Sequence, residues 1–510
     1  MRVTLPVLAR RLSHVCSLKP YKETKWLMPN GNPTAIYIYN CVADQRVPVI
    51  LNDPHVATWY SCGPTVYDSA HIGHASCYVK LDIIQRILKN FFNIKLITAM
   101  GVTDIDDKII KRANETKTDY KTIAKQYEHE FWQDMSSLNI EKPLIICRVS
   151  EHVNSIQNFI KKLIDSHMAY ITHDGSVYFD TSMFPNYGKL QKMQDTGEPS
   201  RSDKKNKMDF ALWKGHKPGE PYWEATWGKG RPGWHIECSA MVSKIFGSQL
   251  DFHAGGIDLQ FPHHENEEAQ SCAFHDTIQW ANYWIHVGHL LTKGDTKMSK
   301  SLQNTISIPY LLESYSADTF RMACLMSNYR YPMEYDSKMM KTAEDVLSKF
   351  KYFIKDALAY VNNNSDEYVG DYKVSLLDNL QKVEESINDA LKSDFDTSSC
   401  VNTLLNLISN THKVIKFEGS YYPVPVLLIT EYIMSVLKKF GLKLEDTLQD
   451  NISNTVIDTL VEFRHEVRLN ALSRKDKDIL TACDIVRDKM KSLKVQINDS
   501  NKTPSWVFTK

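Results

Sequence analysis

The sequence lacks an excess of charge of either sign, since 61 lysines and arginines balance 61 aspartates and glutamates. This neutrality argues against non-specific binding of nucleic acid by the whole surface, but it permits a local basic groove. The sequence also lacks any apolar run long enough to cross a bilayer. We therefore expect no membrane contact, and the 510 residues indicate three or four domains.

CxxC pairs are also absent, although the sequence holds ten cysteines. A zinc ribbon and a thioredoxin-type redox pair are therefore not indicated, since both depend on that motif. Scattered cysteines in a chain of this size indicate free thiols in a reducing compartment rather than a disulfide framework. A cysteine that binds a metal would need co-ligands from distant segments of the chain.

Acidic residues are missing from the first 22 positions, which hold five basic ones, Arg2, Arg10, Arg11, Lys19 and Lys22. Leucine and valine recur there at helical spacing. This composition is typical of a mitochondrial presequence, because a secretory signal needs a longer unbroken apolar centre. We predict a presequence over residues 1–22 and a location in the mitochondrial matrix; a disordered basic tail is the alternative.

A strand, a turn, a helix and a second strand follow one another after residue 55. The segment "VATWYSC" is typical of a buried strand and ends in the turn "GPT". A long helix is predicted from near His71, and "IKLITAM" is the next strand. This βαβ order indicates a parallel nucleotide-binding sheet, to which "QLDFHAGG" and "WIHVGHL" add later strands.

We predict an α/β fold with a Rossmann-type parallel-sheet catalytic domain, split by an insertion and followed by a mainly α-helical C-terminal region. The insertion contains a β-rich patch, "DGSVYFDTS", and a lysine-bearing loop, "SRSDKKNKMD". The expected boundaries are 35–150 for the first half of the catalytic domain, 151–230 for the connective insertion, 231–305 for the second half, 306–370 for a stem-contact segment and linker, and 371–510 for the helical region.

The tetrapeptide His71-Ile72-Gly73-His74 stands at the predicted start of the long helix. Unpaired backbone amides and the positive end of the helix dipole make that position a seat for phosphate. Gly73 allows close approach of a flat base because no Cβ intervenes. The imidazoles can donate hydrogen bonds to phosphate oxygens. Taken alone, two structural histidines would be the default interpretation.

A second motif, "TKMSKS", follows the predicted strand "WIHVGHL" and a turn. Lys297 and Lys300 bracket small residues in a predicted mobile loop, where their ammonium groups would neutralise a pyrophosphate leaving group. A lysine pair alone is usually solvated surface. Together and in this order, HIGH and KMSKS resemble the paired signature of class I aminoacyl-tRNA synthetases.

A third set of residues points to a metal site. "GRPGWHIECSAM" contains Cys238, and "HAGGIDLQFPHHENEEAQ" contains two histidines and three glutamates. His263 and Glu267 are four apart on a helix and share a face, but His264 and Glu268 have the same relation, so spacing leaves both pairs open. Either pair, with Cys238 and the cysteine of "YSCGPT", would form a mixed zinc site from three distant segments.

These segments resemble the cysteinyl-tRNA synthetase family through "CGPTVYD", "HIGH", "VTDIDDKIIKRA", "DFALWK", "GRPGWHIECSAM", "GGIDLQFPHHENE" and "KMSKS". The resemblance covers the chain from about residue 35 and thins after Asp336. It implies a catalytic and ATP-binding set of His71, Gly73, His74, Lys297, Met298, Ser299 and Lys300. It implies a cysteine pocket of Gly63, Thr103, Trp234 and Asp258. It implies zinc ligands at Cys62, Cys238, His263 and Glu267.

The resemblance implies a cysteine–tRNA ligase that works in two steps. L-cysteine attacks ATP, with Mg²⁺ on the phosphates, and the cysteinyl-adenylate then passes to the 3′ end of tRNA-Cys. Zinc would separate cysteine from serine, because a thiol of pKa ~8.5 deprotonates readily on the metal and a thiolate is a strong soft ligand. Shape alone supplies only about 1–3 kcal/mol for so small a difference. We expect a monomer whose partners are tRNA-Cys, ATP and L-cysteine.

Members of the family are also credited with cysteine persulfide synthesis that uses pyridoxal phosphate on lysines near "KIIKR" and "KMSKS". Lys108, Lys111, Lys297 and Lys300 stand at those places here. The region from 371 resembles the anticodon-binding part of the family. Candidate RNA contacts there are Arg464, Arg468, Arg474, Lys475 and Trp506.

Four alternatives stay open. A cysteine ligase acting on a non-RNA amine would lack the long helical C-terminal region that is present here. An inactive, synthetase-like RNA-binding protein would usually have lost signature residues. The zinc site could be purely structural, although a carboxylate ligand argues mildly against that. Cys62 near HIGH could be an acyl-transfer nucleophile, although convergence with Cys238 explains its thiol better.

Overall fold

The computed structural model describes residues 26–191, 203–292, 296–297, 305–362, 372–416, 421–444, 451–499 and 504–508. The predicted presequence and residues 298–301 of the KMSKS motif lie outside these ranges. The chain divides into two compact units, Met1–Leu442 and Lys443–Lys510, which are described separately below. No helix among the described residues is both long enough and apolar enough to span a membrane.

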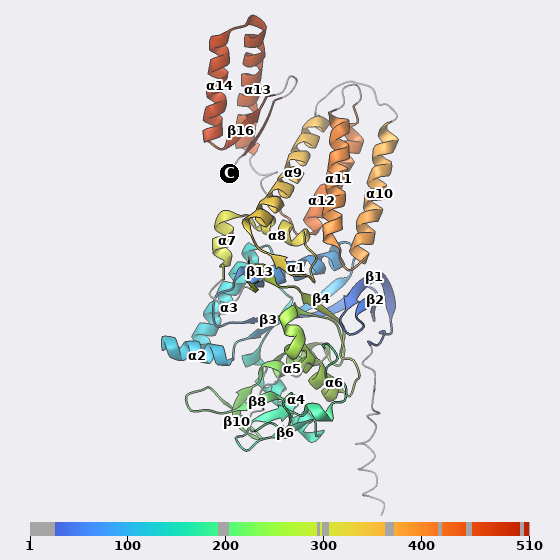
Figure 1. The fold of residues 1–510 in the computed structure, drawn as a ribbon, viewed down its shortest axis with the longest axis vertical. Helices are drawn as coiled ribbons and strands as arrows, with labels where there is room; N and C mark the ends of the chain where they lie inside the picture. The colour runs from blue at the N-terminus through green and yellow to red at the C-terminus, as the bar shows by residue number, and fades with distance from the viewer. Residues whose placement is uncertain are drawn as a thin grey trace, which may run out of the picture. The chain divides into compact units, whose positions relative to one another are not determined.

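A parallel sheet with the strand order β12-β11-β3-β4-β5 lies at the centre of the first unit (Figure 1). Its strands are β3 (Val56–Thr65), β4 (Lys95–Thr103), β5 (Ile145–Arg148), β11 (Leu250–Gly256) and β12 (Ala281–Val287). Every residue of β12 is buried, as expected of a strand covered on both faces. The predicted Rossmann-type parallel sheet is therefore confirmed.

The chain enters this sheet in the middle, at β3, and builds outward through β4 to β5. It then crosses to the other side and adds β11 and β12, so β3 and β11 are neighbours although they are far apart in sequence. The strand order reverses between these two strands. In open α/β sheets, ligands bind at such a point, outside the carboxyl ends of the strands.

Helices connect and cover the strands of this sheet. They are α1 (Ile72–Asn90), α2 (Asp107–Thr116), α3 (Tyr120–Ser137), α4 (Val153–Asp165), α5 (Trp234–Phe246) and α6 (Glu265–His275), with the short turns η1 (Val149–Glu151), η2 (Thr181–Met183), η3 (Ile257–Leu259) and η4 (Gln260–His264). The helix predicted from near His71 is α1, and His71 is its N-cap. Its apolar face is buried, as the periodicity predicted.

A second sheet interrupts the first between β5 and β11, with the order β6-β7-β8-β10-β9 and antiparallel pairing. Its strands are β6 (Ala169–Ile171), β7 (Val177–Phe179), β8 (Phe210–Gly215), β9 (Trp223–Ala225) and β10 (Gly228–Pro232). The β-rich patch "DGSVYFDTS" supplies β7. Smaller sheets pair β1 (Asn32–Asn40) with β2 (Gln45–Leu51), and β13 (Leu290–Thr292) with β14 (Thr296–Lys297) and β15 (Met333–Glu334).

Helices dominate the remainder of the first unit: α7 (Ile308–Ser314), α8 (Ala317–Leu325), α9 (Ser337–Asn362), α10 (Tyr372–Lys392), α11 (Thr397–Ile415) and α12 (Pro423–Lys439). A buried ion pair joins this region to the sheet domain, because Arg321 Nη1 of α8 donates to Asp82 Oδ2 of α1 at 2.5 Å. The same guanidinium donates to the carbonyls of Asn139 and Phe440 at 2.8 and 3.3 Å. The predicted helical C-terminal region is confirmed.

The second unit consists of α13 (Asn451–Arg474), α14 (Lys477–Ser492), β16 (Val495–Asn498) and β17 (Ser505–Phe508). Two of its candidate RNA contacts are used internally. Trp506 is buried and its indole donates to Asp458 at 2.6 Å. Arg464 is buried and donates to Asp499 at 2.5 Å and to the carbonyl of Cys483 at 2.8 Å. Both side chains therefore stabilise this unit itself.

Candidate active site

Four potential metal ligands from three distant segments meet at the carboxyl end of the central sheet. Cys62 lies near the end of β3, Cys238 lies in α5, His263 lies in η4, and Glu267 lies in the first turn of α6. All four side chains are buried, and their ligand atoms lie within 4.8 Å of one another. We call this group the ligand cluster.

The distances within the ligand cluster are short. Cys62 Sγ lies 3.9 Å from Cys238 Sγ and 3.5 Å from Glu267 Oε1. His263 Nε2 lies 3.7 Å from Cys238 Sγ and 2.9 Å from Glu267 Oε1. This arrangement brings together the four residues that the family resemblance implies.

The second pair allowed by helical spacing is arranged differently. Glu268 forms a buried ion pair with Lys189 at 2.5 Å, and its carboxylate is occupied away from the thiols. His264 does approach Cys62, with Nε2 at 3.4 Å from Sγ, and it belongs to an overlapping set with His253. The structure therefore separates the two glutamates clearly and leaves both histidines beside the thiols.

Further histidines around the ligand cluster were missed by the sequence reasoning. His253 Nε2 lies 2.8 Å from Glu267 Oε2, and His235 Nδ1 lies 2.9 Å from His263 Nδ1. His286 Nε2 lies 2.9 Å from His264 Nδ1. Each ring can fix the orientation of the group it touches. The available signal was a lone histidine inside each apolar strand, "QLDFHAGG" and "WIHVGHL".

The electrostatics of the ligand cluster favour charged ligands. A hydrogen bond from Cys62 lowers the pKa of Cys238 to about 6, whereas burial raises the pKa of Cys62 well above its usual value. Burial raises the pKa of Glu267, but His253 and His263 outweigh it and bring the value to about 2. One thiolate and one carboxylate are thus available at neutral pH. Burial lowers the pKa of His263, but Glu267 and Cys238 outweigh it and raise the value to about 10.

The HIGH motif forms the start of α1. His71 Nδ1 accepts a hydrogen bond from the Gly73 N–H at 3.1 Å, and His74 Nδ1 accepts one from the His71 N–H at 3.3 Å. The two rings stack with centroids 3.9 Å apart. This reciprocal capping holds both imidazoles at the helix N-terminus, where the dipole favours an anion.

The segment after the KMSKS motif returns to the start of α1. The Ile72 N–H donates to the carbonyl of Ile306 at 2.9 Å, and His71 pairs with Ser307 as an isolated β-bridge. A cavity of about 410 Å³ lies there, lined by His71, Ser307 and Tyr310 among others. Lys297 ends β14, whereas Met298, Ser299 and Lys300 lie outside the described residues. The segment at Ile306 and Ser307 that follows the motif is thus anchored beside HIGH.

The residues implied for the cysteine pocket differ in their relation to the ligand cluster. Trp234 is partly exposed and stacks on His263, with ring centroids 4.3 Å apart. Thr103 ends β4 and donates to Glu237 at 2.9 Å. Asp258 lies in η3 and is half exposed, with His289 4.0 Å away.

Gly63 directly follows Cys62 and leaves no room for a side chain. A Cβ there would lie 2.0 Å from the carbonyl oxygen of Gly101 on β4, which is backbone and cannot turn aside. A glycine is therefore required for β3 and β4 to approach each other at this point. That close approach sets the position of the Cys62 thiol.

This geometry agrees with comparisons to known proteins. Residues 49–345 match the family described as "tRNA synthetases class I (C) catalytic domain". The fold resembles that of methionyl-tRNA synthetase from Mycobacterium tuberculosis, with a TM-score of 0.57 and 13% identity, covering 80% of this chain and 94% of that one. A leucyl-tRNA synthetase complex from Agrobacterium radiobacter also gives a TM-score of 0.57, at 8% identity over 78% and 86% of the two chains. The chain is a class I aminoacyl-tRNA synthetase.

Similarity to curated proteins identifies the branch of this class. The chain is 40% identical to "Probable cysteine--tRNA ligase, mitochondrial" of Xenopus tropicalis, over 94% of this chain and 91% of that protein. It is 38% identical to "Cysteine--tRNA ligase, cytoplasmic" of Dictyostelium discoideum, over 96% and 80%. It is 37% identical to "Cysteine--tRNA ligase" of Methanococcus aeolicus, over 92% and 99%. The chain belongs to the cysteine–tRNA ligase family.

Proposed function

We propose that this chain activates L-cysteine with ATP and transfers it to the 3′ end of tRNA-Cys, and that zinc held by the ligand cluster selects the substrate thiol. The observation that carries the proposal is the buried meeting of Cys62, Cys238, His263 and Glu267 beside the N-terminus of α1. This juxtaposition supports a thiol-recognising group that acts next to a phosphate seat. Adenylation of cysteine needs both.

The donor set fits zinc in chemistry and in spacing. Zinc takes sulfur, nitrogen and carboxylate ligands at about 2.0–2.3 Å, so tetrahedral sulfurs lie about 3.8 Å apart and a sulfur lies about 3.6 Å from nitrogen or oxygen. The corresponding distances here are 3.9 Å for the two sulfurs, 3.7 Å for Cys238 to His263 and 3.5 Å for Cys62 to Glu267. The 2.9 Å contact of His263 with Glu267 is a hydrogen bond that would lengthen by about 0.5 Å.

Bound zinc would supply a soft Lewis acid that favours a thiolate over an alcohol. The chain's own groups supply the rest of the cysteine site. Trp234 covers His263 and forms an apolar wall, while the carboxylate of Asp258 suits the substrate ammonium group. Such a site rejects serine chemically, and we expect no editing domain.

The N-terminus of α1 is suited to the phosphates of ATP. His71 and His74 are held by their mutual capping bonds, so their imidazoles are preorganised for developing negative charge. Mg²⁺ would accompany the ATP, and Lys297 and Lys300 would close on the pyrophosphate. No side-chain nucleophile is needed, because the cysteine carboxylate attacks the α-phosphorus and the adenosine hydroxyl of tRNA then attacks the carbonyl.

Replacement of Cys238 by serine tests the proposal. We expect Cys238→Ser to lose bound zinc and cysteine-dependent ATP–pyrophosphate exchange, measured by metal analysis and by exchange of labelled pyrophosphate. Cys483→Ser is the matched control, because Cys483 is also buried but lies in the second unit. Wild-type exchange by Cys238→Ser without metal would refute the zinc assignment.

We also propose that the chain acts as a monomer. Its proposed location is the mitochondrial matrix, which is supported by the basic N-terminal composition and by mitochondrial names among the relatives. Import of the full chain into isolated mitochondria tests the location. Persulfide synthesis with pyridoxal phosphate stays a prediction from the family resemblance. Lys108 and Lys111 are exposed on α2, so borohydride trapping of the cofactor followed by peptide mapping would test it.

A further inference from the structure

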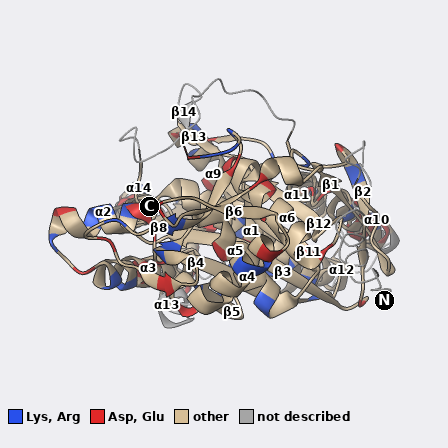
Figure 2. Ribbon diagram, turned by 90° about the horizontal axis from the view of Figure 1, so that it is seen from below, with Lys and Arg blue, Asp and Glu red and all other residues tan. Residues whose placement is uncertain are grey.

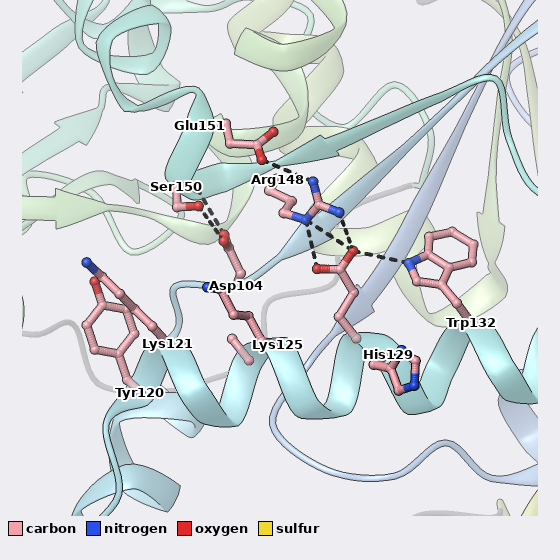
Figure 3. A pocket seen from close by; sticks show the side chains of 11 residues that line it. Asp104, Tyr120, Lys121, Lys125, His129, Trp132, Arg148, Ser150 and Glu151 are labelled. Atoms are coloured by element: carbon pink, nitrogen blue, oxygen red, sulfur yellow. Dashed lines mark hydrogen bonds and ion pairs between the residues drawn. The ribbon is translucent and has the colours of Figure 1, made fainter.

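A cavity of about 720 Å³ lies between α3 and the segment that follows β5, and none of its lining residues belongs to the ligand cluster (Figure 3). Its carboxylates already have partners. Arg148 donates to Glu128 at 2.8 Å and to Glu151 at 3.0 Å. Asp104 accepts from the Ser150 N–H at 2.9 Å. A polar atom that lacks a partner of this kind lies instead on β3, beside the ligand cluster.

This atom is the hydroxyl oxygen of Tyr60. The Tyr60 side chain is fully buried, and its hydroxyl has no hydrogen-bond partner among the residues that the structure describes. β3 itself offers no charged acceptor, because the strand contains neither Asp nor Glu (Figure 2). Buried polar groups in native proteins nearly always have a partner, so an unpaired hydroxyl indicates an acceptor that is supplied on binding.

The hydroxyl occupies the place that a side chain of Gly101 would take. A Cβ on Gly101 would lie 2.1 Å from the Tyr60 hydroxyl oxygen and 3.1 Å from Met241 Cε of α5. Gly101 of β4 is the register partner of Cys62, and neighbouring strands lie about 4.8 Å apart. Tyr60 and Cys62 are two residues apart on β3, so their side chains share a face of the sheet. The hydroxyl therefore lies beside Cys62, on the face covered by the helix that carries Cys238.

The ring of Tyr60 lies against the carboxylate side of the ligand cluster. It packs edge-on against His253, with ring centroids 5.3 Å apart, and His253 bonds Glu267 Oε2 at 2.8 Å. Burial raises the pKa of Tyr60 well above its usual value, and Cys238, Cys62 and Glu267 add to the effect. The hydroxyl therefore keeps its proton at neutral pH and can act as a donor.

A metal-bound sulfur is the acceptor that fits this donor. The sulfur of a thiol accepts hydrogen bonds only weakly, whereas a sulfur that binds zinc is a negatively charged thiolate. Hydrogen bonds to a charged acceptor are roughly twice as strong as neutral ones. Groups that bond to the ligands of a metal hold those ligands in place and tune the metal.

We propose that Tyr60 is a positioning residue of the zinc site, and that its hydroxyl donates a hydrogen bond to the thiolate of Cys62 when zinc is bound. This bond fixes the Cys62 side chain and offsets part of its negative charge. Zinc then receives less charge from Cys62 and is a stronger Lewis acid toward the substrate thiol. The inference rests on the proposed function, because it assumes zinc in the ligand cluster.

The test uses the full-length variant Tyr60→Phe, which removes the hydroxyl and keeps the ring against His253. We expect the Kd for zinc, measured by competition with a chelator, to rise about 10- to 100-fold. After zinc is removed, the urea midpoint of unfolding stays at or above the wild-type value, because the lost hydroxyl had no partner. With cobalt in place of zinc, the thiolate-to-cobalt charge-transfer band moves to lower energy, because the sulfur loses a hydrogen-bond donor.

Tyr283→Phe is the matched control, because it makes the same replacement in β12 of the same sheet. The Tyr283 hydroxyl accepts from the Ile50 N–H at 2.7 Å and donates to the carbonyl of Pro48 at 3.0 Å. We expect this variant to lower the urea midpoint, because these bonds are lost, and to leave the Kd for zinc and the cobalt band unchanged.

The outcomes separate this inference from the function on which it rests. A Tyr60→Phe variant with the wild-type Kd for zinc and an unshifted cobalt band overturns the inference and leaves the zinc site standing. A weaker zinc site with an unshifted band and a lowered urea midpoint also overturns it, because Tyr60 would then only support the fold. A wild-type chain that binds no zinc overturns the proposed zinc site, and this inference with it.

Discussion

Glu265 holds the segment before the insertion's lysine loop against the helix that carries Glu267. Its Oε1 accepts from the N–H groups of Gly188 and Lys189 at 2.8 and 3.1 Å, and its Oε2 accepts from the Leu190 N–H at 2.7 Å. The Glu265 side chain is fully buried. Replacement by glutamine keeps the shape but turns one of these acceptor oxygens into an NH₂ group.

The expected cost follows from this geometry. In whichever direction the new amide turns, at least one backbone N–H loses its acceptor and the amide N–H group has no acceptor of its own. A buried unsatisfied polar group costs about 1–3 kcal/mol. We therefore expect Glu265→Gln to lower the free energy of unfolding by about 2–4 kcal/mol.

Urea unfolding followed by tryptophan fluorescence measures this loss. The control is Glu115→Gln, because Glu115 is exposed on α2 and its contact with Lys111 is 3.9 Å long. Such a surface pair contributes about 0–1 kcal/mol. A change below about 0.5 kcal/mol for Glu265→Gln would refute the reasoning that these three backbone bonds hold the segment.

Two further predictions concern a buried acid and the KMSKS loop. Burial raises the pKa of Asp134 to about 6, and Glu130 adds to the effect. Because the ionised carboxylate disfavours folding, the free energy of unfolding of the wild-type chain increases as the pH falls from above 6 toward about 3.9, the pKa of aspartate in the unfolded chain. Asp134→Asn should therefore raise the free energy of unfolding by about 1–3 kcal/mol at pH 7.5 and by almost nothing at pH 4, and equal gains at both pH values would contradict this. Lys300→Ala should lower the turnover of cysteine adenylation by about 100-fold with cysteine binding kept, and an unchanged rate would exclude its role.

The sequence allowed the architecture to be predicted because its signals are local. Apolar runs and helical periodicity indicate β3, α1 and β4 at the expected places. The prediction that "GPT" is a turn was wrong, because Gly63, Pro64 and Thr65 continue β3. The interrupted sheet was also expected from the order of segments. Pairings between distant segments, such as Glu265 with Gly188–Leu190, have no local signal and were not foreseen.

The convergence of Cys62, Cys238, His263 and Glu267 could be predicted from the sequence, whereas the surroundings of these residues could not. Spacing left His263–Glu267 and His264–Glu268 equally open. The structure distinguishes the two glutamates, because Glu267 lies 3.5 Å from Cys62 Sγ and Glu268 forms a buried ion pair with Lys189. His253 was read as part of an ordinary strand, because one histidine in an apolar run is usually a core residue. Its contact with Glu267 depends on how β11 packs against α6, which periodicity does not give.

Two candidate RNA contacts near the C-terminus have partners inside the protein instead. Arg464 and Trp506 were considered as RNA contacts because basic and aromatic residues suit phosphates and bases. Both are buried in the second unit, with carboxylates of Asp499 and Asp458 as partners. Residue type alone does not distinguish an exposed arginine from one that forms a buried ion pair.

The central claim is that a thiol-selecting metal site serves tRNA aminoacylation. The most direct measurement is the ratio of kcat/KM for cysteine and serine in the charging of a tRNA-Cys transcript by the wild-type chain. Shape alone would give a ratio of about 10–200, whereas recognition of the thiol itself gives about 10⁴ or more. We predict a ratio above about 10⁴ that falls when zinc is removed by a chelator and returns when zinc is restored. A ratio within about 200, or one that is unaffected by loss of the metal, would contradict the account.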